Sequence, residues 1–353
     1  MDKLLRASGI VLLAIGATYA NAGEQSSVSN TDQIAFVSIR DGDAHIYVTD
    51  GKGEERKLTK DGTNNGQPAW SPDGKLIAYT SNREGQPKIF IMGSDGLNPR
   101  RLSKDERIEM AASFSPDGKS IAYFSRSTDT PVVDLRITEL ETGKSVSVAA
   151  NGDEKGPNPP KWSSDSSKLV FLAKEGRYSD VWVVDSDGKD ARPISKEFNK
   201  NGKADPEFSP DSRHVTYVAD MRGSMHLVTI DLVTGVARDL TPDSKAVNHS
   251  PRWSPDGKSI AFASTRDDEF NSRGDIFVMK VDGTEVRNLS KDPHEDYCPQ
   301  WTADGNSIVF SSLRTGTAQV FAVDIDSSTT RRLMTNTSHD MDHTPRWVTM
   351  HQN

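Results

Sequence analysis

The sequence predicts an all-β protein, a seven-bladed β-propeller built from four-stranded antiparallel blades. Three observations predict it: a repeat of nearly fixed length, four short strands in each repeat, and an incomplete unit at each end of the chain. The composition agrees, because 34% hydrophobic residues suit many half-buried strands, and 26 glycines and 18 prolines suit many turns. Beyond the N-terminal segment, no stretch shows convincing helical periodicity.

The repeat is marked by an aromatic residue that stands just before a turn with the letters SPDG or a close relative. Successive markers lie 44, 48, 46, 45 and 48 residues apart. A period in this range indicates a propeller or a solenoid. The six marking residues are Trp70, Phe114, Trp162, Phe208, Trp253 and Trp301.

Residues 253–290 show the contents of one unit. The segments WS, KSIAFAS, DIFVMK and EVRNLS have the lengths and the alternation of short strands, and the turns PDG and VDG separate two pairs of them. Asp-Gly favours a hairpin, because glycine accepts the positive φ that such turns need. Four antiparallel strands in about 45 residues make one propeller blade.

The partial units at the two ends set the number of blades. Residues 34–38, 45–49 and 56–59 match the second to fourth strands of a blade, and residues 344–348 match a first strand. Together they make a seventh blade, so the C-terminal strand is expected to join the N-terminal blade and close the ring. Closure removes exposed sheet edges. A six-bladed ring is the less favoured count, and deletion from Asp342 onward is expected to open the ring.

The N-terminus matches a secretory signal peptide over residues 1–22. Lys3 and Arg6 precede the apolar run GIVLLAIGA, and Ala20 and Ala22 form a small-x-small cleavage site. We expect cleavage after Ala22 and a mature protein in the periplasm or outside the cell.

A short linker over residues 23–33 and a single propeller domain over residues 34–350 are expected to follow. No other stretch approaches the length of a membrane span, so we expect a protein that does not span a membrane. A monomer is also expected. Cys298 is the lone cysteine, which excludes an intramolecular disulfide. A buried, inert thiol is the expected state.

Composition and motifs narrow the function. A formal net charge of −8 argues against nucleic acid as a partner. The chain has no G-x-S-x-G elbow and no glycine-rich phosphate loop that leads into a helix, so nucleophilic hydrolases and nucleotide-binding enzymes are not favoured.

The repeated Asp of SPDG has two interpretations, a ligand for a cation or part of a turn. The turn is favoured, because the decayed copies SDSS and SPDSR keep Asp165 and Asp211 but lose the glycine. In a blade, the loops that follow strands one and three lie on one face of the disc. The variable loops then share the opposite face, where loops on a rigid scaffold carry function.

Two polar patterns mark that opposite face. Asp or Asn stands three residues before a Pro at Asn65, Asn248, Asp296 and Asp342. Strand two ends in Ser-x-Arg at Arg40, Arg83, Arg266 and Arg314. These groups could pair with one another, since arginine suits carboxylates. They could also line a polar funnel at the central channel that binds a partner or a divalent cation such as Ca²⁺.

Four of the eight histidines fall in the loops that lead into strand one of three adjacent blades: His249, His294, His339 and His343. Together with Asp342 they could hold a transition metal, and a neutral imidazole could act as a general base. The alternative is that polar loops simply expose histidines.

The unit P-x-W-S-P-D-G-K-x-I-A-F-x-S-x-R, followed by I-F-V-M-x-x-D-G and R-x-L-S, resembles the repeat of the TolB-like propellers, a WD40-like repeat. Residues 251–290 carry it nearly in full, and the likeness extends over residues 34–348. The resemblance implies a periplasmic propeller of the Tol–Pal envelope system. That family joins an N-terminal α/β domain to six blades, whereas here about 11 residues separate the predicted signal peptide from the first strand, and seven blades are counted.

The architecture also resembles that of oligogalacturonate lyases, seven-bladed propellers with histidines around a metal at the channel mouth. This implies an alternative function, a metal-assisted polysaccharide lyase in which His249, His294 and His343 act with Arg266 and Arg314. The leading expectation is a binding module without catalysis, which takes a protein or glycan partner through its loop face and central channel.

Overall fold

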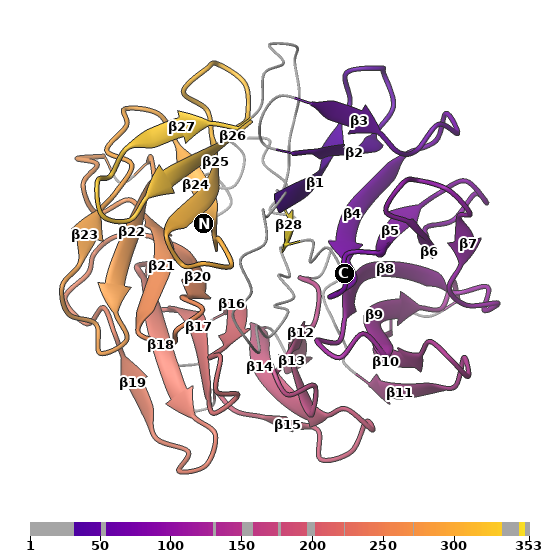
Figure 1. Ribbon diagram of the computed structural model, residues 1–353. Helices are drawn as coiled ribbons and strands as arrows, with labels where there is room; N and C mark the ends of the chain where they lie inside the picture. Colours follow the sequence, from indigo (N-terminus) through magenta and orange to yellow (C-terminus); the bar gives the residue numbers. More distant parts are fainter. Residues whose placement is uncertain are drawn as a thin grey trace.

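The computed structural model describes residues 32–50, 54–129, 132–149, 158–175, 178–195, 202–221, 223–270, 272–333 and 346–349. Over these ranges the chain forms seven four-stranded sheets arranged around one axis (Figure 1). The predicted seven-bladed β-propeller is confirmed. The predicted signal peptide lies outside the described residues, as do His339, Asp342 and His343. Searched over the same ranges, the chain holds no helix with the length and apolarity needed to cross a membrane.

Each sheet is one blade (Figure 1). The strands of each blade are given below in order from the one nearest the axis to the one at the rim. The blade that joins the two chain ends contains β28 (Arg346–Thr349), β1 (Asp32–Ser38), β2 (His45–Thr49) and β3 (Glu55–Lys57). The next contains β4 (Asn65–Trp70), β5 (Leu76–Ser81), β6 (Lys88–Gly93) and β7 (Arg100–Arg101). The third contains β8 (Ile108–Phe114), β9 (Ser120–Arg126), β10 (Val133–Glu139) and β11 (Ser145–Ala149).

The other four blades follow in chain order. The fourth blade contains β12 (Lys161–Trp162), β13 (Lys168–Glu175), β14 (Tyr178–Asp185) and β15 (Arg192–Pro193), and the fifth contains β16 (Lys203–Phe208), β17 (His214–Asp220), β18 (Met225–Asp231) and β19 (Ala237–Asp239). The sixth contains β20 (Asn248–Trp253), β21 (Ser259–Ser264), β22 (Asp275–Lys280) and β23 (Arg287–Asn288). The seventh contains β24 (Asp296–Trp301), β25 (Ser307–Ser312), β26 (Gln319–Asp324) and β27 (Thr330–Arg332).

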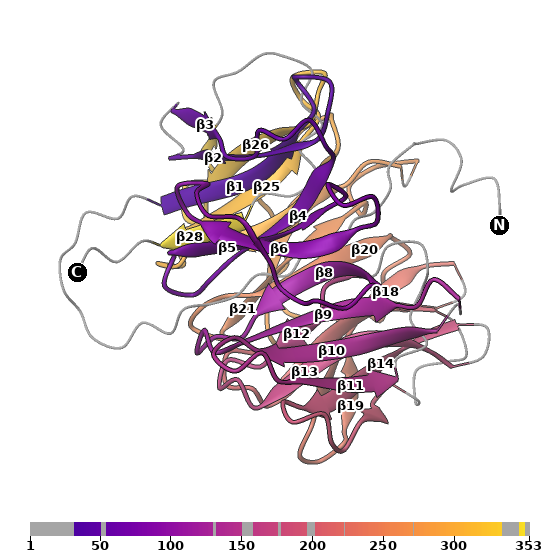
Figure 2. The same cartoon turned by 90° about the vertical axis from the view of Figure 1, so that its right-hand side faces the viewer.

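The ring is closed by the C-terminal strand. β28 pairs antiparallel with β1, so that Ile34 faces Trp347 and Asp32 faces Thr349, and the two strands lie side by side in both views (Figures 1 and 2). The first strand of the chain therefore has a hydrogen-bonded neighbour on each side, which protects an edge that would otherwise be open.

The apolar core lies between neighbouring blades. One cluster, for example, joins Val218 and Leu227 of β17 and β18 to Trp253, Phe262 and Phe277 of the next blade. These side chains are inward members of the period-two pattern, so the alternation within each strand builds the contacts that hold adjacent blades together.

The SPDG segments are turns stabilised by one recurring hydrogen-bond pattern. The Ser71 hydroxyl donates to Asp73 Oδ1 at 2.7 Å and accepts the N–H of Leu76 at 2.9 Å. The same hydroxyl-to-carboxylate bond recurs in the other five copies: Ser115–Asp117, Ser163–Asp165, Ser209–Asp211, Ser254–Asp256 and Thr302–Asp304. The side of the ring that carries these turns, residues 71–75, 115–119, 163–167, 209–213, 254–258 and 302–306, is called the turn face. The opposite side, which carries the loop after each second strand, is the loop face.

Where SPDG loses its glycine, serine takes the left-handed conformation. Ser166 and Ser212 have φ of 61° and 59°, which costs free energy for a residue with a Cβ. Each serine gains a contact with another blade: Ser166 Oγ accepts the Asp117 N–H at 3.1 Å, and Ser212 Oγ lies 2.8 Å from Ser164 Oγ. The two copies without glycine therefore keep the turn, and their serines also form hydrogen bonds between blades.

The innermost strands contain bulges that the alternation did not predict. Five non-glycine residues in them have positive φ, from 49° to 58°: Gln67, Ala111, Asp205, Ser250 and Cys298. The bulges turn backbone N–H groups toward the preceding blade. The Ser250 N–H donates to Asp205 Oδ2, and the Ala111 N–H donates to Gln67 Oε1, both at 2.9 Å.

Candidate functional site

Four blades end their second strand with the same five-residue pattern, aromatic-x-Ser-x-Arg. In each, the arginine Nε donates to the serine two residues before it, at 2.8 to 3.2 Å. Each guanidinium also lies over an aromatic pair that faces across two strands, 4.4 to 5.8 Å from the ring centroids, a cation–π contact. We call these sites the arginine corners, formed by Arg40, Arg83, Arg266 and Arg314.

Three of the arginine corners are neutralised by a carboxylate of the protein. Arg40 Nη1 lies 2.5 Å from Glu55 Oε2, and Arg83 Nη2 lies 2.6 Å from Asp61 Oδ2. Arg314 Nη2 lies 2.8 Å from Asp296 Oδ2, and Asp292 stands 3.6 Å from its Nε.

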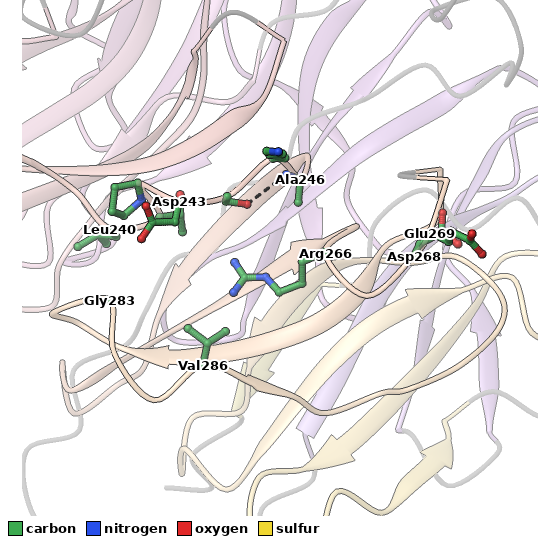
Figure 3. A pocket seen from close by; sticks show the side chains of 12 residues that line it. Leu240, Asp243, Ala246, Arg266, Asp268, Glu269, Gly283 and Val286 are labelled. Carbon is green, nitrogen blue, oxygen red and sulfur yellow. Dashed lines mark hydrogen bonds between the residues drawn. The ribbon is translucent and has the colours of Figure 1, made fainter.

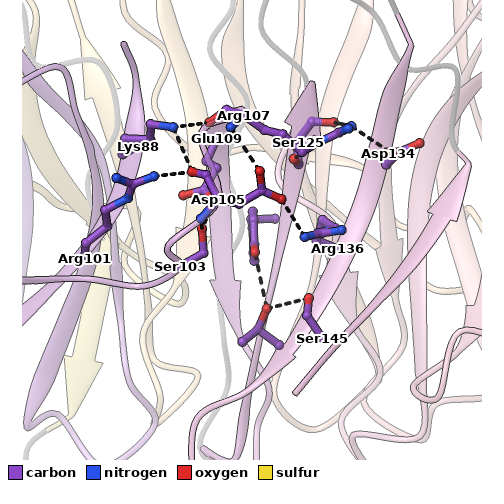
Figure 4. Close-up of polar contacts among 12 residues, drawn as sticks. Lys88, Arg101, Ser103, Asp105, Arg107, Glu109, Ser125, Asp134, Arg136 and Ser145 are labelled. Carbon is purple, nitrogen blue, oxygen red and sulfur yellow. Dashed lines mark hydrogen bonds and ion pairs between the residues drawn. The ribbon is translucent and has the colours of Figure 1, made fainter. Parts of the chain in front are cut away.

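The third blade has the same serine–guanidinium contact, but its arginine comes from a different position in the blade, which the sequence did not predict. Ser125 stands where the corner serine is expected, and its hydroxyl accepts from Nε of Arg107 at 2.7 Å (Figure 4). Arg107 precedes β8 and pairs with Asp134 at 2.6 Å. A paired guanidinium is thus kept even where the Ser-x-Arg letters are lost.

Three of the four Asn and Asp residues predicted for binding lie at the start of innermost strands, and Asp342 lies outside the described residues. Asn65, Asn248 and Asp296 are at most 1% exposed. Asn65 donates to Asp61 at 3.0 Å, and so supports the carboxylate that pairs with Arg83. Burial raises the pKa of Asp296, opposed by hydrogen bonds from Ser312 and Ser290 and by the charge of Arg314. These residues position the arginines rather than face solvent.

Arg266 differs from the other arginine corners. Its Nη2 donates to the neutral amide oxygen of Asn248 at 3.1 Å. Within the described ranges no carboxylate comes within ion-pair distance, 4.0 Å, of its guanidinium, and the charge of Asp267 acts on it without such a contact. Burial lowers the pKa of Arg266 from its ordinary value. Among the residues that the structure describes, this partly buried cation therefore has no carboxylate partner.

Arg266 also lines a pocket of about 630 Å³ in the groove between the blades β16–β19 and β20–β23. The lining comes from the β19–β20 loop (residues 240–246), from the β21–β22 loop and from Gly283 and Val286 after β22. Figure 3 shows Arg266 between Asp243 on one side and Asp268 with Glu269 on the other. Hydrogen bonds from the Ser272 N–H above all, and from Arg273 and the Ser272 hydroxyl, lower the pKa of Asp268 to about 2.

The histidines do not share a contact among the described residues. His249 is half-buried with Nδ1 3.3 Å from Ser250 Oγ, and burial lowers its pKa. His294 is exposed and lies 2.9 Å from Asp292. Over the ranges that the structure describes, no group of three or more His, Cys, Asp or Glu is placed to hold a metal ion. Burial raises the pKa of Cys298 to about 12, so it is an inert thiol at neutral pH.

Comparison with known proteins agrees with the fold. The family model described as the TolB beta propeller domain matches residues 21–205, 89–241 and 203–352. A curated relative, the Tol-Pal system protein TolB of Francisella tularensis subsp. mediasiatica (strain FSC147), is 28% identical over 130 residues, which are 35% of this chain and 29% of that protein. The match thus spans less than a third of the relative.

Two solved structures are similar in fold. The crystal structure of TolB from Acinetobacter baumannii aligns with a TM-score of 0.52 at 23% identity, over 71% of this chain and 61% of that one. An oligogalacturonate lyase in complex with manganese aligns with a TM-score of 0.66 at 17% identity, over 84% of this chain and 86% of that one. At these identities the likeness concerns the fold alone.

Proposed function

The chain belongs to the family of TolB β-propeller domains, and from that premise we propose that it is a binding module of the periplasm or cell exterior. It takes a protein or glycan partner through its loop face and the central channel of the ring. Catalysis forms no part of this function. The predicted signal peptide, residues 1–22, would deliver the protein there.

The observation that carries this proposal is the difference between the two faces. On the turn face, Ser or Thr hydroxyls and Asp carboxylates hydrogen-bond to one another and to the turn backbone in six copies. The loop face borders the pocket beside Arg266 and carries Phe270, whose residue surface is 78% exposed. An exposed aromatic and an arginine on the same β21–β22 loop offer binding groups of the kind that are enriched at interfaces.

Within this function the predicted residues have different roles. Arg266 is the arginine corner open to a partner, whereas Arg83 and Arg314 are occupied by carboxylates. Asn65, Asn248 and Asp296 are buried and orient the corners. Asp342 lies outside the described residues and stays a prediction.

Photo-crosslinking from the two faces tests the proposal. A photoreactive phenylalanine replaces Phe270 or Glu84 on the loop face, and Lys119 or Lys258 on the turn face as matched exposed controls. In cells that make the protein, irradiation is expected to give discrete larger species from the loop-face positions only. Equal or stronger adducts from the turn face would contradict the proposal.

The alternative is a metal-assisted lyase acting on polyuronates, supported by the fold likeness to a lyase that binds manganese. It would use His249, His294 and His343 with Arg266 and Arg314, and a divalent cation, calcium or a transition metal, held by His249, His294, His339, His343 and Asp342. Three of these ligands lie outside the described residues.

Metal analysis of the purified protein and absorbance at the unsaturated-uronide band distinguish the two functions. Bound metal together with product from oligogalacturonate, lost in His343→Ala with the fold intact, would replace the binding module by the lyase. A protein that forms no unsaturated product with any added divalent metal is the result expected for the binding module.

A further inference from the structure

The groove beside Arg266 suits one kind of ligand, which deepens the proposed function and rests on it. We propose that this groove binds a protein segment that carries a single carboxylate flanked by basic residues. The carboxylate pairs with Arg266, and the flanking cations meet the acids at the groove's margin. Comparison with the other arginine corners is the main support.

Comparison of the four repeats shows which partner Arg266 lacks among the described residues. In the corners of Arg40, Arg83 and Arg314 the guanidinium meets a carboxylate oxygen at 2.5, 2.6 and 2.8 Å. In the corner of Arg266, which has the same serine bond and the same aromatic pair, the amide oxygen of Asn248 stands there instead. A guanidinium recognises a carboxylate through a planar fork of donors, so a ligand carboxylate supplies the missing partner.

The surroundings of Arg266 favour contact with a ligand side chain. The guanidinium is held by the Ser264 hydroxyl and by Phe262 and Phe277, and little ordering remains to be done when a ligand arrives. Leu240 and Val286 add apolar surface to the same pocket. A volume of about 630 Å³ accommodates a few side chains.

The acids at the margin select the ligand class. Asp243 and Glu269 are exposed on the pocket lining, and Asp267 and Asp268 lie next to Arg266 in sequence. Asp268 is engaged by Arg273 at 2.9 Å, and Asp267 accepts from Asn288 at 2.8 Å. Lys245 adds one cation to the lining. A polyuronate, with a negative charge on every sugar, would be repelled by these acids and by the net charge of −8. A lone carboxylate between cations would not.

Two tripeptide probes that differ in one group test this directly. Acetyl-Lys-Glu-Lys-amide and acetyl-Lys-Gln-Lys-amide are titrated into the full protein in low-salt buffer, and heat is measured. Nonspecific attraction to an acidic protein would favour the Gln peptide, which is the more cationic. Recognition by Arg266 is expected to reverse this and to make the Glu peptide bind about tenfold more tightly, the scale of a charged hydrogen bond.

Two variants assign the preference to the groove. Arg266→Met keeps a long side chain over the aromatic pair but removes the cation, and Asn248→Asp supplies a carboxylate from within the protein. Both are expected to abolish the preference for the Glu peptide. Arg40→Lys, in a corner already paired with Glu55, is the matched control and is expected to retain the preference.

Several results would overturn the proposal. One is the absence of any preference for the Glu peptide in the unmodified protein; another is a preference that survives Arg266→Met in a folded variant. Tighter, Arg266-dependent binding of trigalacturonate than of the Glu peptide would show that the ligand class is wrong. Loop-face crosslinks that persist while the peptide preference is absent would contradict this inference but not the proposed function, whereas loss of the crosslinks would contradict the function.

Discussion

The corners of Arg314 and Arg266 lie in adjacent blades and share local sequence, FSSLR in one and FASTR in the other. Both guanidinium groups bond to a serine and cover two phenylalanines. They differ in what completes them: Asp296 pairs with Arg314, and Asn248 bonds to Arg266. The serine bond and the aromatic contacts are therefore the same in both corners. The residue that faces the guanidinium, Asp296 or Asn248, decides whether the arginine forms an internal ion pair or is open to a ligand.

The largest effect is expected from opening the ring that holds both corners in place. Deletion of residues 342–353 removes β28, so that β1 loses the neighbour that Ile34 and Asp32 pair with. The blade of Arg314 packs on the β1 blade through Val309 and Phe36, and should loosen first. We expect loss of the single cooperative thermal transition, measured by calorimetry and circular dichroism. A truncated chain with an unchanged transition would contradict the closure.

The next effect separates the two corners by stability. Arg314→Met leaves the buried carboxylate of Asp296 without its cation and should lower the free energy of unfolding by about 3 kcal/mol. Arg266→Met loses only a bond to a neutral amide, a serine bond and a cation–π contact, with an expected cost of about 1 kcal/mol. Urea denaturation at pH 7 measures both. Equal losses of unfolding free energy in the two variants would contradict the claim that only Arg314 has a buried carboxylate partner.

Changing the partner should convert one corner into the other. In an Asn248→Asp background, Arg266 gains an internal carboxylate, so Arg266→Met should cost more there than in the unmodified protein. The double-mutant cycle is expected to give a coupling of about 1–3 kcal/mol between positions 248 and 266. Coupling near zero would show that Asn248 does not occupy the partner position.

The smallest effects concern the pH dependence of the unfolding free energy, in which a carboxyl group of the turn face is compared with one behind the loop face. The Ser254 hydroxyl bond above all, with the N–H and charge of Lys258, lowers the pKa of Asp256. A carboxyl with a lowered folded-state pKa stabilises the fold above its unfolded value near 3.8 and loses this as the pH falls through the folded value. Asp256→Asn should therefore flatten the acid limb of unfolding free energy against pH, by at most about 1 kcal/mol because the turn is exposed.

Asp296 should behave in the opposite sense. Its folded-state pKa is raised by burial, so its contribution is fully present below pH 3.8 and is lost as the pH rises through the folded value. Asp296→Asn should remove a decline in stability that begins above pH 3.8. Urea titrations between pH 2.5 and 6 measure both slopes, and slopes of the same sign for Asp256 and Asp296 would contradict the assignment of the two environments.

Much of the fold could be predicted because its determinants are local. Asp-Gly turns, alternating strands and the 44–48 residue spacing act within a few residues, so the seven blades and the closing strand followed from the letters. The bulges at Ser250 and Cys298 could not, because their positive φ is stabilised by contacts with the preceding blade, such as the Asp205 bond to Ser250.

The difference between the corners was visible in the sequence but could not be interpreted there. Asn stands at both position 65 and position 248, yet Arg83 finds a carboxylate in Asp61, four residues before Asn65, and Arg266 finds none within the described residues. Only the folded arrangement shows which asparagine lies beside an arginine that has no carboxylate partner among the described residues. In the same way, the role of Arg107 in the third blade depends on a contact across 18 residues to Ser125.

Arginine-selective nuclear magnetic resonance tests the central claim most directly, because it observes the Nε–H group of each corner separately. Arg266→Met identifies the resonance of Arg266 by its absence. On titration with acetyl-Lys-Glu-Lys-amide, the Arg266 signal is expected to move in a saturable way, while the signals of Arg40 and Arg314 stay in place. A bound peptide that leaves the Arg266 signal unmoved, or that shifts all the corners alike, would contradict the claim that Arg266 is the open corner.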